Sequence, residues 1–131
     1  MGRQVIAAIG TDLVDIDRIR AAHTRWGDRF LNRVYTPREI AYCFRKGKNY
    51  GSLAARFAAK EATMKALGTG WKRGVRWVDL EVVRKPGSAP QMVLHGRSAE
   101  LAAGRRFLVS LTHTDTQALA VVIAQSPPST I

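Results

Sequence analysis

The charged side chains whose spacing could best support chemistry lie in residues 51–70, GSLAARFAAKEATMKALGTG. If this stretch is helical, Arg56 and Lys60 share one row of its surface, and Glu61 and Lys65 share a neighbouring row. A single carboxylate among cations, beside a glycine-rich turn, suits a site that holds a metal ion and phosphate groups. The alternative interpretation is a solvated helix face with a surface ion pair worth under about 1 kcal/mol. Spacing alone favours the solvated face.

The same residues are predicted to form one helix that ends in a glycine turn. Ser52 can cap its start, no proline interrupts the run, and alanine, leucine and methionine are strong helix formers. Gly68 stands where a left-handed C-cap residue is expected. Apolar side chains recur at helical spacing and should form the buried stripe of this helix: Leu53, Phe57, Met64 and Leu67.

Aspartates gather after the first apolar run of the chain. Residues 5–9 are predicted to be a strand that ends near Asp12, and Asp15 or Asp17 could cap a helix that runs to about Trp26. Acidic residues stabilise a helix N-terminus by roughly 0.3–1 kcal/mol each, which is one explanation for the cluster. Asp12, at the strand end and outside the helix, could instead face a metal ion. The sequence does not separate these two explanations.

The length of 131 residues, with 46% hydrophobic and 24% charged residues, predicts one domain with a proper core. Residues 1–125 are expected to make up this domain, and residues 126–131 a disordered tail. The sequence has no apolar run of about 18 residues and no signal-peptide pattern, which argues against a membrane protein. Cys43 is the lone cysteine, so no disulfide can form within the chain, and a reducing cytoplasm is the expected location.

The formal net charge of +11, from 21 basic and 10 acidic residues, predicts a polyanionic partner. Nucleic acid, an anionic membrane, a phosphorylated small molecule and an acidic protein all meet this description. Residues 71–77, WKRGVRW, could stack nucleic-acid bases, or could pack on the core as a lid. A non-catalytic interaction subunit is a further alternative. The sequence contains no Walker loop, GxGxxG fingerprint, metal-spaced Cys/His cluster or nucleophile elbow.

A second helix and two hairpins complete the predicted fold. Residues 36–39, TPRE, have the threonine, proline and glutamate of a capping box and should begin a helix. Residues 30–35 are expected to be a short apolar segment, and residues 45–49 a basic loop. Apolar runs are predicted to pair as hairpins, 80–83 with 91–94 and 107–112 with 118–123. The predicted fold class is α+β, with a small, mainly antiparallel sheet packed against the long central helix.

Three segments of the chain carry a family pattern when they are taken together. They are IGTDLVDIDRI at residues 9–19, RFAAKEATMKALGTG at 56–70 and VSLTHT at 109–114. In this order and spacing they resemble the holo-[acyl-carrier-protein] synthases, the small 4'-phosphopantetheinyl transferases. The central segment is the most specific, because F-x-x-K-E-A-x-x-K-A followed by glycines is the signature of that family. The resemblance covers about residues 4–124.

This resemblance implies transfer of the 4'-phosphopantetheine arm of coenzyme A to a serine of apo acyl-carrier protein, with release of adenosine 3',5'-bisphosphate. It also implies a divalent metal, usually Mg²⁺, and a homotrimer with an active site in each cleft between subunits. An acidic carrier protein would account for the net charge of +11 through electrostatic steering, so that neither nucleic acid nor a membrane is needed as partner.

The site residues that the resemblance implies fall into groups. Asp12 and Glu61 match the metal-binding carboxylates. The chemistry of the transfer adds that the serine proton needs a base, for which Glu61 acting through a metal-bound water is expected. Lys65 matches the lysine near the pyrophosphate, where it would neutralise developing charge. Arg18 matches a helix position that docks the carrier protein. The other matches lie beside the metal acid or along the coenzyme A cleft: Lys60, Arg56, Gly68, Thr69 and His113.

Overall fold

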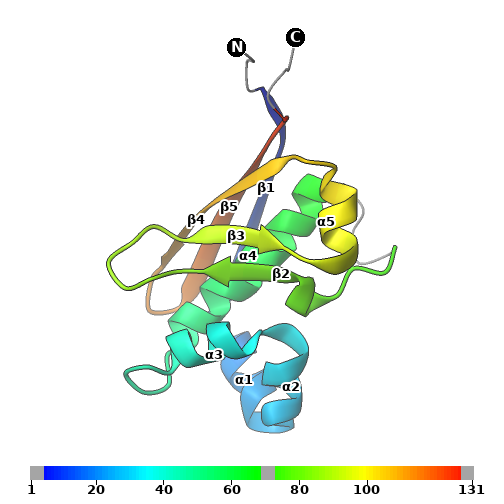
Figure 1. Cartoon of the computed structure of the whole chain (residues 1–131). Coiled ribbons are helices and arrows are strands. Elements are labelled where there is room, and N and C mark those ends of the chain that lie inside the picture. Colours follow the sequence, from blue (N-terminus) through cyan, green and yellow to red (C-terminus); the bar gives the residue numbers. More distant parts are fainter. Residues whose placement is uncertain (1–4, 69–72, 128–131) are drawn as a thin grey trace.

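The computed structural model describes residues 5–68 and 73–127, and it places one long helix, α4, in the middle of the molecule (Figure 1). The helices of the described residues are α1 (Ile16–Trp26), α2 (Asp28–Val34), α3 (Pro37–Cys43), α4 (Tyr50–Leu67), the 3₁₀ turn η1 (Trp77–Asp79) and α5 (Gly96–Ala102). The strands are β1 (Ile6–Asp15), β2 (Leu80–Val83), β3 (Gln91–Leu94), β4 (Arg106–His113) and β5 (Gln117–Gln125). The predicted α+β class is confirmed.

The strands form two antiparallel sheets, one in the order β1-β5-β4 and the other made of β2 and β3. Both predicted hairpins are therefore confirmed. β1 pairs with β5 along almost its whole length, from Ile6 opposite Gln125 to Asp15 opposite Gln117. The start of β1 and the end of β5 consequently lie together, at the end of the molecule opposite α1 and α2 (Figure 1).

Helix α4 is buried on nearly every side, because the three-stranded sheet covers one face and β2, α1 and α3 contact others (Figure 1). The predicted stripe of Leu53, Phe57, Met64 and Leu67 is buried, as expected. Alanines fill the remaining faces and allow neighbouring elements to approach closely. These buried alanines are Ala54, Ala55, Ala58, Ala59, Ala62 and Ala66.

The ends of α4 differ in part from the prediction. The cap is Asn49, whose Oδ1 accepts a hydrogen bond from the Ser52 amide at 2.9 Å, so the prediction that Ser52 caps the helix was wrong. Ser52 lies inside the first turn, where its hydroxyl accepts from Arg56 Nη1 at 2.7 Å. The left-handed C-cap at Gly68 is confirmed, with φ of 78°.

The N-terminal part of the chain departs from the prediction at two further places. β1 continues to Asp15 rather than ending near Asp12, because β5 offers a partner at each of these positions. Residues 30–35 are mostly helical: α2 runs over Asp28–Val34, with Leu31 and Val34 buried on one side. The predicted capping box at Thr36 and Glu39, which begins α3, is confirmed.

Gly10 is the point at which β1 comes closest to α4. A Cβ atom on Gly10 would lie 1.9 Å from the backbone oxygen of Ala62, so any side chain at this position would push the strand and helix apart. Asp12 follows two residues later on the same strand. The missing side chain of Gly10 therefore allows the carboxylate of Asp12 to lie next to α4.

The last strand, β5, ends at Gln125, and the limit of the domain at this residue stays a prediction. Most of the predicted tail, residues 128–131, lies outside the described residues. Within residues 5–68 and 73–127, none of the helices combines the length and apolar character needed to cross a membrane. Cys43 is buried and free, as its isolation in the sequence predicted.

Candidate active site

Charged side chains meet along the line where β1 crosses α4. Lys65 Nζ donates to the backbone oxygen of Thr11 at 2.8 Å and to Asp12 Oδ1 at 3.2 Å. Glu61 precedes Lys65 by one helical turn and therefore lies on the same side of α4. We call Asp12, Glu61 and Lys65 the carboxylate seam. The structure thus brings Asp12 of the first strand beside Lys65 of the central helix, with Glu61 one turn away on the same side of that helix.

The carboxylate seam fits a magnesium ion by its chemistry. Mg²⁺ prefers oxygen ligands, keeps several waters and usually takes one or two carboxylates together with substrate phosphates. Asp12 and Glu61 supply two carboxylates, and the side chain of Asp12 keeps 16% of its surface exposed. Among the described residues, no group of three or more His, Cys, Asp and Glu could hold a metal. The two carboxylates match the number that Mg²⁺ usually takes from a protein.

A basic pocket lies at the other end of α4, where the helix begins. Its volume is about 260 Å³, and it is lined by parts of α3, α4, β4, the loop before α4 and the loop after β2. Three arginines and a histidine contribute to its wall: Arg45, Arg56, Arg84 and His113. Such a concentration of cations favours a phosphate-bearing ligand.

Arg56 is the most informative residue of the basic pocket. It is only 2% exposed, and its guanidinium stacks on the ring of Tyr42 with Cζ 4.4 Å from the ring centroid. Nη1 donates to Ser52, but Nε and Nη2 are buried and have no hydrogen-bond partner among the described residues. Leaving buried donors unsatisfied is costly, so a buried guanidinium with two unpartnered nitrogen atoms suits an anion.

His113 lies against the first turn of α4. Its Nδ1 is 3.0 Å from the backbone oxygen of Thr114, a contact that suits an Nδ1–H donor. A Cβ on Gly51 would lie 2.7 Å from Cε1 of this imidazole, so the glycine makes room for the ring. The structure therefore brings the predicted His113 and Arg56 to one pocket, as parts of β4 and α4.

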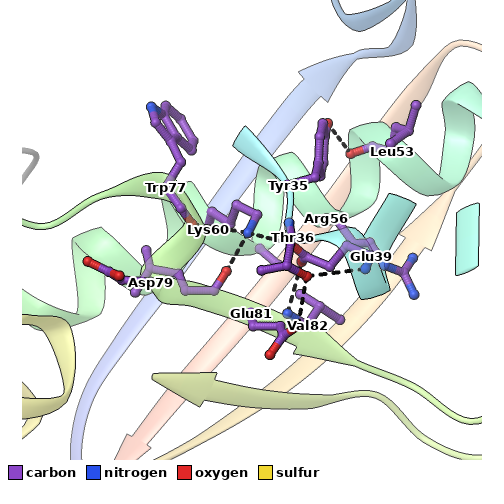
Figure 2. A network of polar contacts seen from close by, with 12 residues as sticks. Tyr35, Thr36, Glu39, Leu53, Arg56, Lys60, Trp77, Asp79, Glu81 and Val82 are labelled. Atoms are coloured by element: carbon purple, nitrogen blue, oxygen red, sulfur yellow. Dashed lines mark hydrogen bonds and ion pairs between the residues drawn. The ribbon is translucent and has the colours of Figure 1, made fainter. Parts of the chain in front are cut away.

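Lys60 belongs to a different environment from the other predicted residues. Its fully buried Nζ donates to Glu39 Oε1 at 2.8 Å, to the backbone oxygen of Trp77 at 3.1 Å and to that of Leu80 (Figure 2). Burial lowers the pKa of the Lys60 amine, while the Glu39 carboxylate opposes that shift. All three N–H groups of the ammonium therefore have acceptors within the protein.

The row of Arg56 and Lys60 is thus not a solvated helix face, and that interpretation of the sequence was wrong. Glu39 was predicted only as part of a capping box, and Glu81 was not singled out. Glu81 Oε2 accepts from the hydroxyl of Thr36 at 2.7 Å, and Oε1 lies 3.0 Å from His95 Nε2. An acidic residue inside an apolar strand was the available signal for Glu81, but its partners are far away in the sequence.

Arg18 lies on α1, and its Cζ is 5.2 Å from the ring centroid of Phe57 on α4. Phe57 stacks in turn on Trp77, with centroids 4.8 Å apart. Trp77 therefore packs against the core, in agreement with the lid interpretation of residues 71–77, of which 71 and 72 lie outside the described residues. Beside α1, a pocket of about 380 Å³ is lined by Trp26, Arg29, Phe30 and Arg33.

One predicted cleft residue, Gly68, lies at the end of α4. Gly68 is the described C-cap, two turns beyond Glu61. Thr69 lies outside the described residues. Several of the predicted residues are therefore collected along α4: the basic pocket lies at its start, and the carboxylate seam and Gly68 lie toward its end.

The model of the 4'-phosphopantetheinyl transferase superfamily matches residues 8–122 of this sequence. The chain belongs to that superfamily. Within it, the sequence is 50% identical over 124 residues to the holo-[acyl-carrier-protein] synthase of Koribacter versatilis, covering 92% of this chain and 99% of that protein. It is 47% identical over 117 residues to the corresponding synthase of Chlamydia muridarum, covering 89% and 93%.

A solved structure of the same superfamily agrees with the fold. The crystal structure of the Helicobacter pylori holo-[acyl-carrier-protein] synthase in complex with coenzyme A matches with a TM-score of 0.79 and 33% identity, over 88% of this chain and 98% of that chain. The predicted resemblance is therefore confirmed, and this chain is an enzyme of the phosphopantetheinyl transferase kind.

The contacts of Glu81 predict how stability depends on pH. Burial acts to raise the pKa of the Glu81 carboxyl, but hydrogen bonds from Thr36 and His95 outweigh it and the pKa is lowered. A carboxylate with a lowered folded pKa stabilises the protein above its unfolded pKa, and this contribution disappears as the pH falls through the folded value. Glu81→Gln should therefore lower the free energy of unfolding at about pH 7, with a difference that shrinks below about pH 4.5.

Urea unfolding of both proteins across this range measures the difference. Glu100→Gln is the matched control, because Glu100 is exposed on α5 and pairs with Arg97 in the same helix. A Glu81→Gln difference that stays constant from neutral to acid pH would contradict the assignment.

Proposed function

We propose that this enzyme transfers the 4'-phosphopantetheine group of coenzyme A to a serine of an acidic apo acyl-carrier protein, with Mg²⁺ as cofactor. The observation that carries the proposal is that α4 bears both a buried arginine with open donors and a carboxylate–lysine cluster. Coenzyme A offers a 3'-phosphate and a pyrophosphate, which suit two such places. The superfamily membership and the coenzyme A complex of the Helicobacter pylori relative support this reading.

The basic pocket is proposed to hold a phosphate of coenzyme A. Arg56 would donate from Nε and Nη2, which are the donors without a partner among the described residues. His113 lines the same pocket. Gly68 and Thr69, predicted from the motif, are proposed to border the cleft at the other end of α4. Lys60 is left out of these contacts because its ammonium is bonded to three protein oxygens.

The metal is proposed to lie at the carboxylate seam, held by Asp12 and Glu61. When bound, Mg²⁺ would supply positive charge against the pyrophosphate. Lys65, whose side chain is 56% exposed, is able to leave Asp12 and donate to a phosphate oxygen. It would thereby stabilise charge that develops on the leaving group.

The transfer step itself requires one proton acceptor from the protein. The serine oxygen of the carrier protein forms a bond to the phosphorus that carries the pantetheine, and the bond from that phosphorus to the bridging oxygen breaks. Adenosine 3',5'-bisphosphate leaves with the bonding electrons. Glu61 is proposed to take the serine proton, because it is the carboxylate on α4 beside Lys65.

The carrier protein is proposed to dock on α1 and α2. Arg18 lies on α1, and a pocket at the end of α1 and on α2 is lined by Trp26, Arg29, Phe30 and Arg33. Cations around exposed aromatic rings suit an acidic helical partner, and the net charge of +11 would speed the encounter. A cytoplasmic location, where such a carrier and coenzyme A would be available, agrees with the free thiol of Cys43.

A homotrimer is proposed as the active form, as the resemblance implied. α4 covers one face of the three-stranded sheet, and the structure leaves large apolar side chains exposed on its strands. Ile9 is 62% exposed and Leu13 59%, and both alternate with buried Gly10 and Val14 on β1. A contiguous exposed apolar surface of this kind marks an interaction site. Three further large apolar side chains are exposed on the strands of this sheet: Ile6 on β1, Leu108 on β4 and Leu119 on β5.

The proposed reaction is tested by mass spectrometry of apo acyl-carrier protein incubated with this protein, coenzyme A and Mg²⁺. The carrier should gain the mass of one phosphopantetheine group. Asp12→Asn and Glu61→Gln should each lower turnover by roughly a thousandfold or more while circular dichroism and melting stay unchanged, because neutral amides bind hard cations poorly.

Asp15→Asn is the matched control, since Asp15 is an exposed aspartate on the same strand whose bond to Gln117 survives as an amide contact. It should turn over normally. Near-normal turnover of either Asp12→Asn or Glu61→Gln would remove the metal assignment, and no mass gain with the unmodified protein would remove the proposed function.

The docking surface is tested by reversing a charge. Arg18→Glu should raise the KM for the carrier protein about tenfold or more and change the KM for coenzyme A by less than about twofold, because opposed charges at a docking surface act on the encounter. Arg97→Glu on α5 gives the same change of net charge away from α1 and should leave both values near normal. An equal effect of Arg18→Glu on both substrates would exclude the docking role.

The homotrimer is tested by light scattering of the chain alone. The unmodified protein should scatter with three times the mass of one chain, and Leu13→Glu should dissociate it, because a charge buried in an apolar interface has no partner. Gln91→Glu, on the exposed side of β3, should keep the trimer. A monomeric unmodified protein at assay concentration would refute the proposal.

A further inference from the structure

Lys60 and Glu39 form an ion pair in which both side chains are fully buried. Glu39 Oε1 also accepts from the Thr36 amide at 2.9 Å, and Oε2 accepts from the Val82 amide at 3.0 Å. Lys60 in turn bonds to the backbone oxygens of Trp77 and Leu80. The pair therefore joins α4 to the start of α3, to η1 and to β2 (Figure 2).

The buried ion pair holds these elements together at a high desolvation cost. Burying two charges costs desolvation energy that their attraction barely repays, and neutral residues of similar volume are often at least as stabilising. The surrounding side chains are largely apolar and would accept such residues, for example Tyr35 and Leu80, both 1% exposed or less. Stability alone therefore does not explain the ion pair.

The ion pair adds a constraint on the rotation of α4 about its own axis. The buried alanines of α4 make no directional contacts of their own, so the rotation of the helix about its axis depends on its few larger buried side chains, and Lys60 is one of these. The ammonium of Lys60, by contrast, must meet its three acceptors in fixed directions. Glu61 is the next residue and points about 100° further around the helix. A fixed Lys60 therefore fixes the direction of Glu61.

We propose that the buried Lys60–Glu39 pair is a positioning device, which holds α4 in the rotation that brings Glu61 and Lys65 to Asp12. Lys60 and Glu39 touch neither substrate nor metal in this proposal, and they act through Glu61 and Lys65. The inference rests on the proposed function, because it assumes that these residues carry the transfer reaction.

The first test replaces both members together. Glu39→Gln/Lys60→Met removes the two charges and leaves no unpaired buried ion, and the single side-chain oxygen of glutamine keeps an acceptor for one of the two amides, that of Thr36 or that of Val82. The double variant should fold and bind coenzyme A with a KM within about threefold of normal, whereas kcat at saturating substrates should fall at least about tenfold. Assays at low temperature, well below melting, keep loss of folded protein out of the rate.

Met92→Ala is the matched control for lost stability, because Met92 is a core residue of β3 that makes a cavity when truncated. It should lower the melting temperature and leave kcat of the folded protein within about twofold of normal. A double variant with the same profile as Met92→Ala would refute positioning and leave a structural role. A rise in the KM for coenzyme A with kcat preserved would refute it in favour of ligand contact.

Glu39→Asp decides the question if the double variant does not fold. It keeps both charges and an acid in the first turn of α3, but shortens the carboxylate arm by a methylene. It should fold and still lose kcat about threefold or more, since α4 must shift to keep the bond. Normal kcat in folded Glu39→Asp would overturn the proposal. The mass gain of the carrier protein with unmodified enzyme is measured alongside, so failure of the proposed function is recognised separately.

Discussion

The burial of α4 is the constraint on which the rest of this structure depends. A helix enclosed on nearly all sides must provide a partner for every charged side chain that it carries inward. Lys60 meets this demand completely, through Glu39 and two backbone oxygens. Arg56 meets it in part, and two of its nitrogen atoms have no partner among the described residues. The difference separates a side chain that serves the fold from one that can serve a ligand.

The same constraint shapes the charge of the surface. Three acidic residues, Glu39, Asp79 and Glu81, are buried and engaged with partners inside the protein or at its edge. Acids drawn inward no longer offset the basic residues outside. Because Arg56 and Lys60 are buried as well, the surface keeps essentially the whole positive excess of the sequence, which matters for any acidic partner that approaches α1 and α2.

Much of the fold could be predicted because its signals are local. Short sequence patterns predicted the capping box at Thr36 and Glu39, the glycine C-cap at Gly68 and both hairpins. The burial of Arg56 and Lys60 could not be predicted in this way. Periodicity reports a contrast between helix faces, and the alanines of α4 remove that contrast.

The residues of the candidate site could be predicted from the sequence, but their arrangement in space could not. The motif pointed to Asp12, Glu61, Lys65 and His113, but their arrangement depends on contacts between distant parts of the chain. Two such contacts are those of Gly10 with Ala62 and of Gly51 with His113. The sequence next to these residues does not predict either contact. Glu81 was missed for the same reason, since its partner Thr36 lies 45 residues away.

The pairing of Ile6 with Gln125 has a practical consequence. The start of β1 lies beside the end of β5. A segment fused before β1 or after β5 would therefore be attached at the same corner of the molecule. That corner is remote from α1 and α2 (Figure 1). An affinity handle or surface anchor attached there would leave the proposed docking face turned outward, whichever terminus carries it.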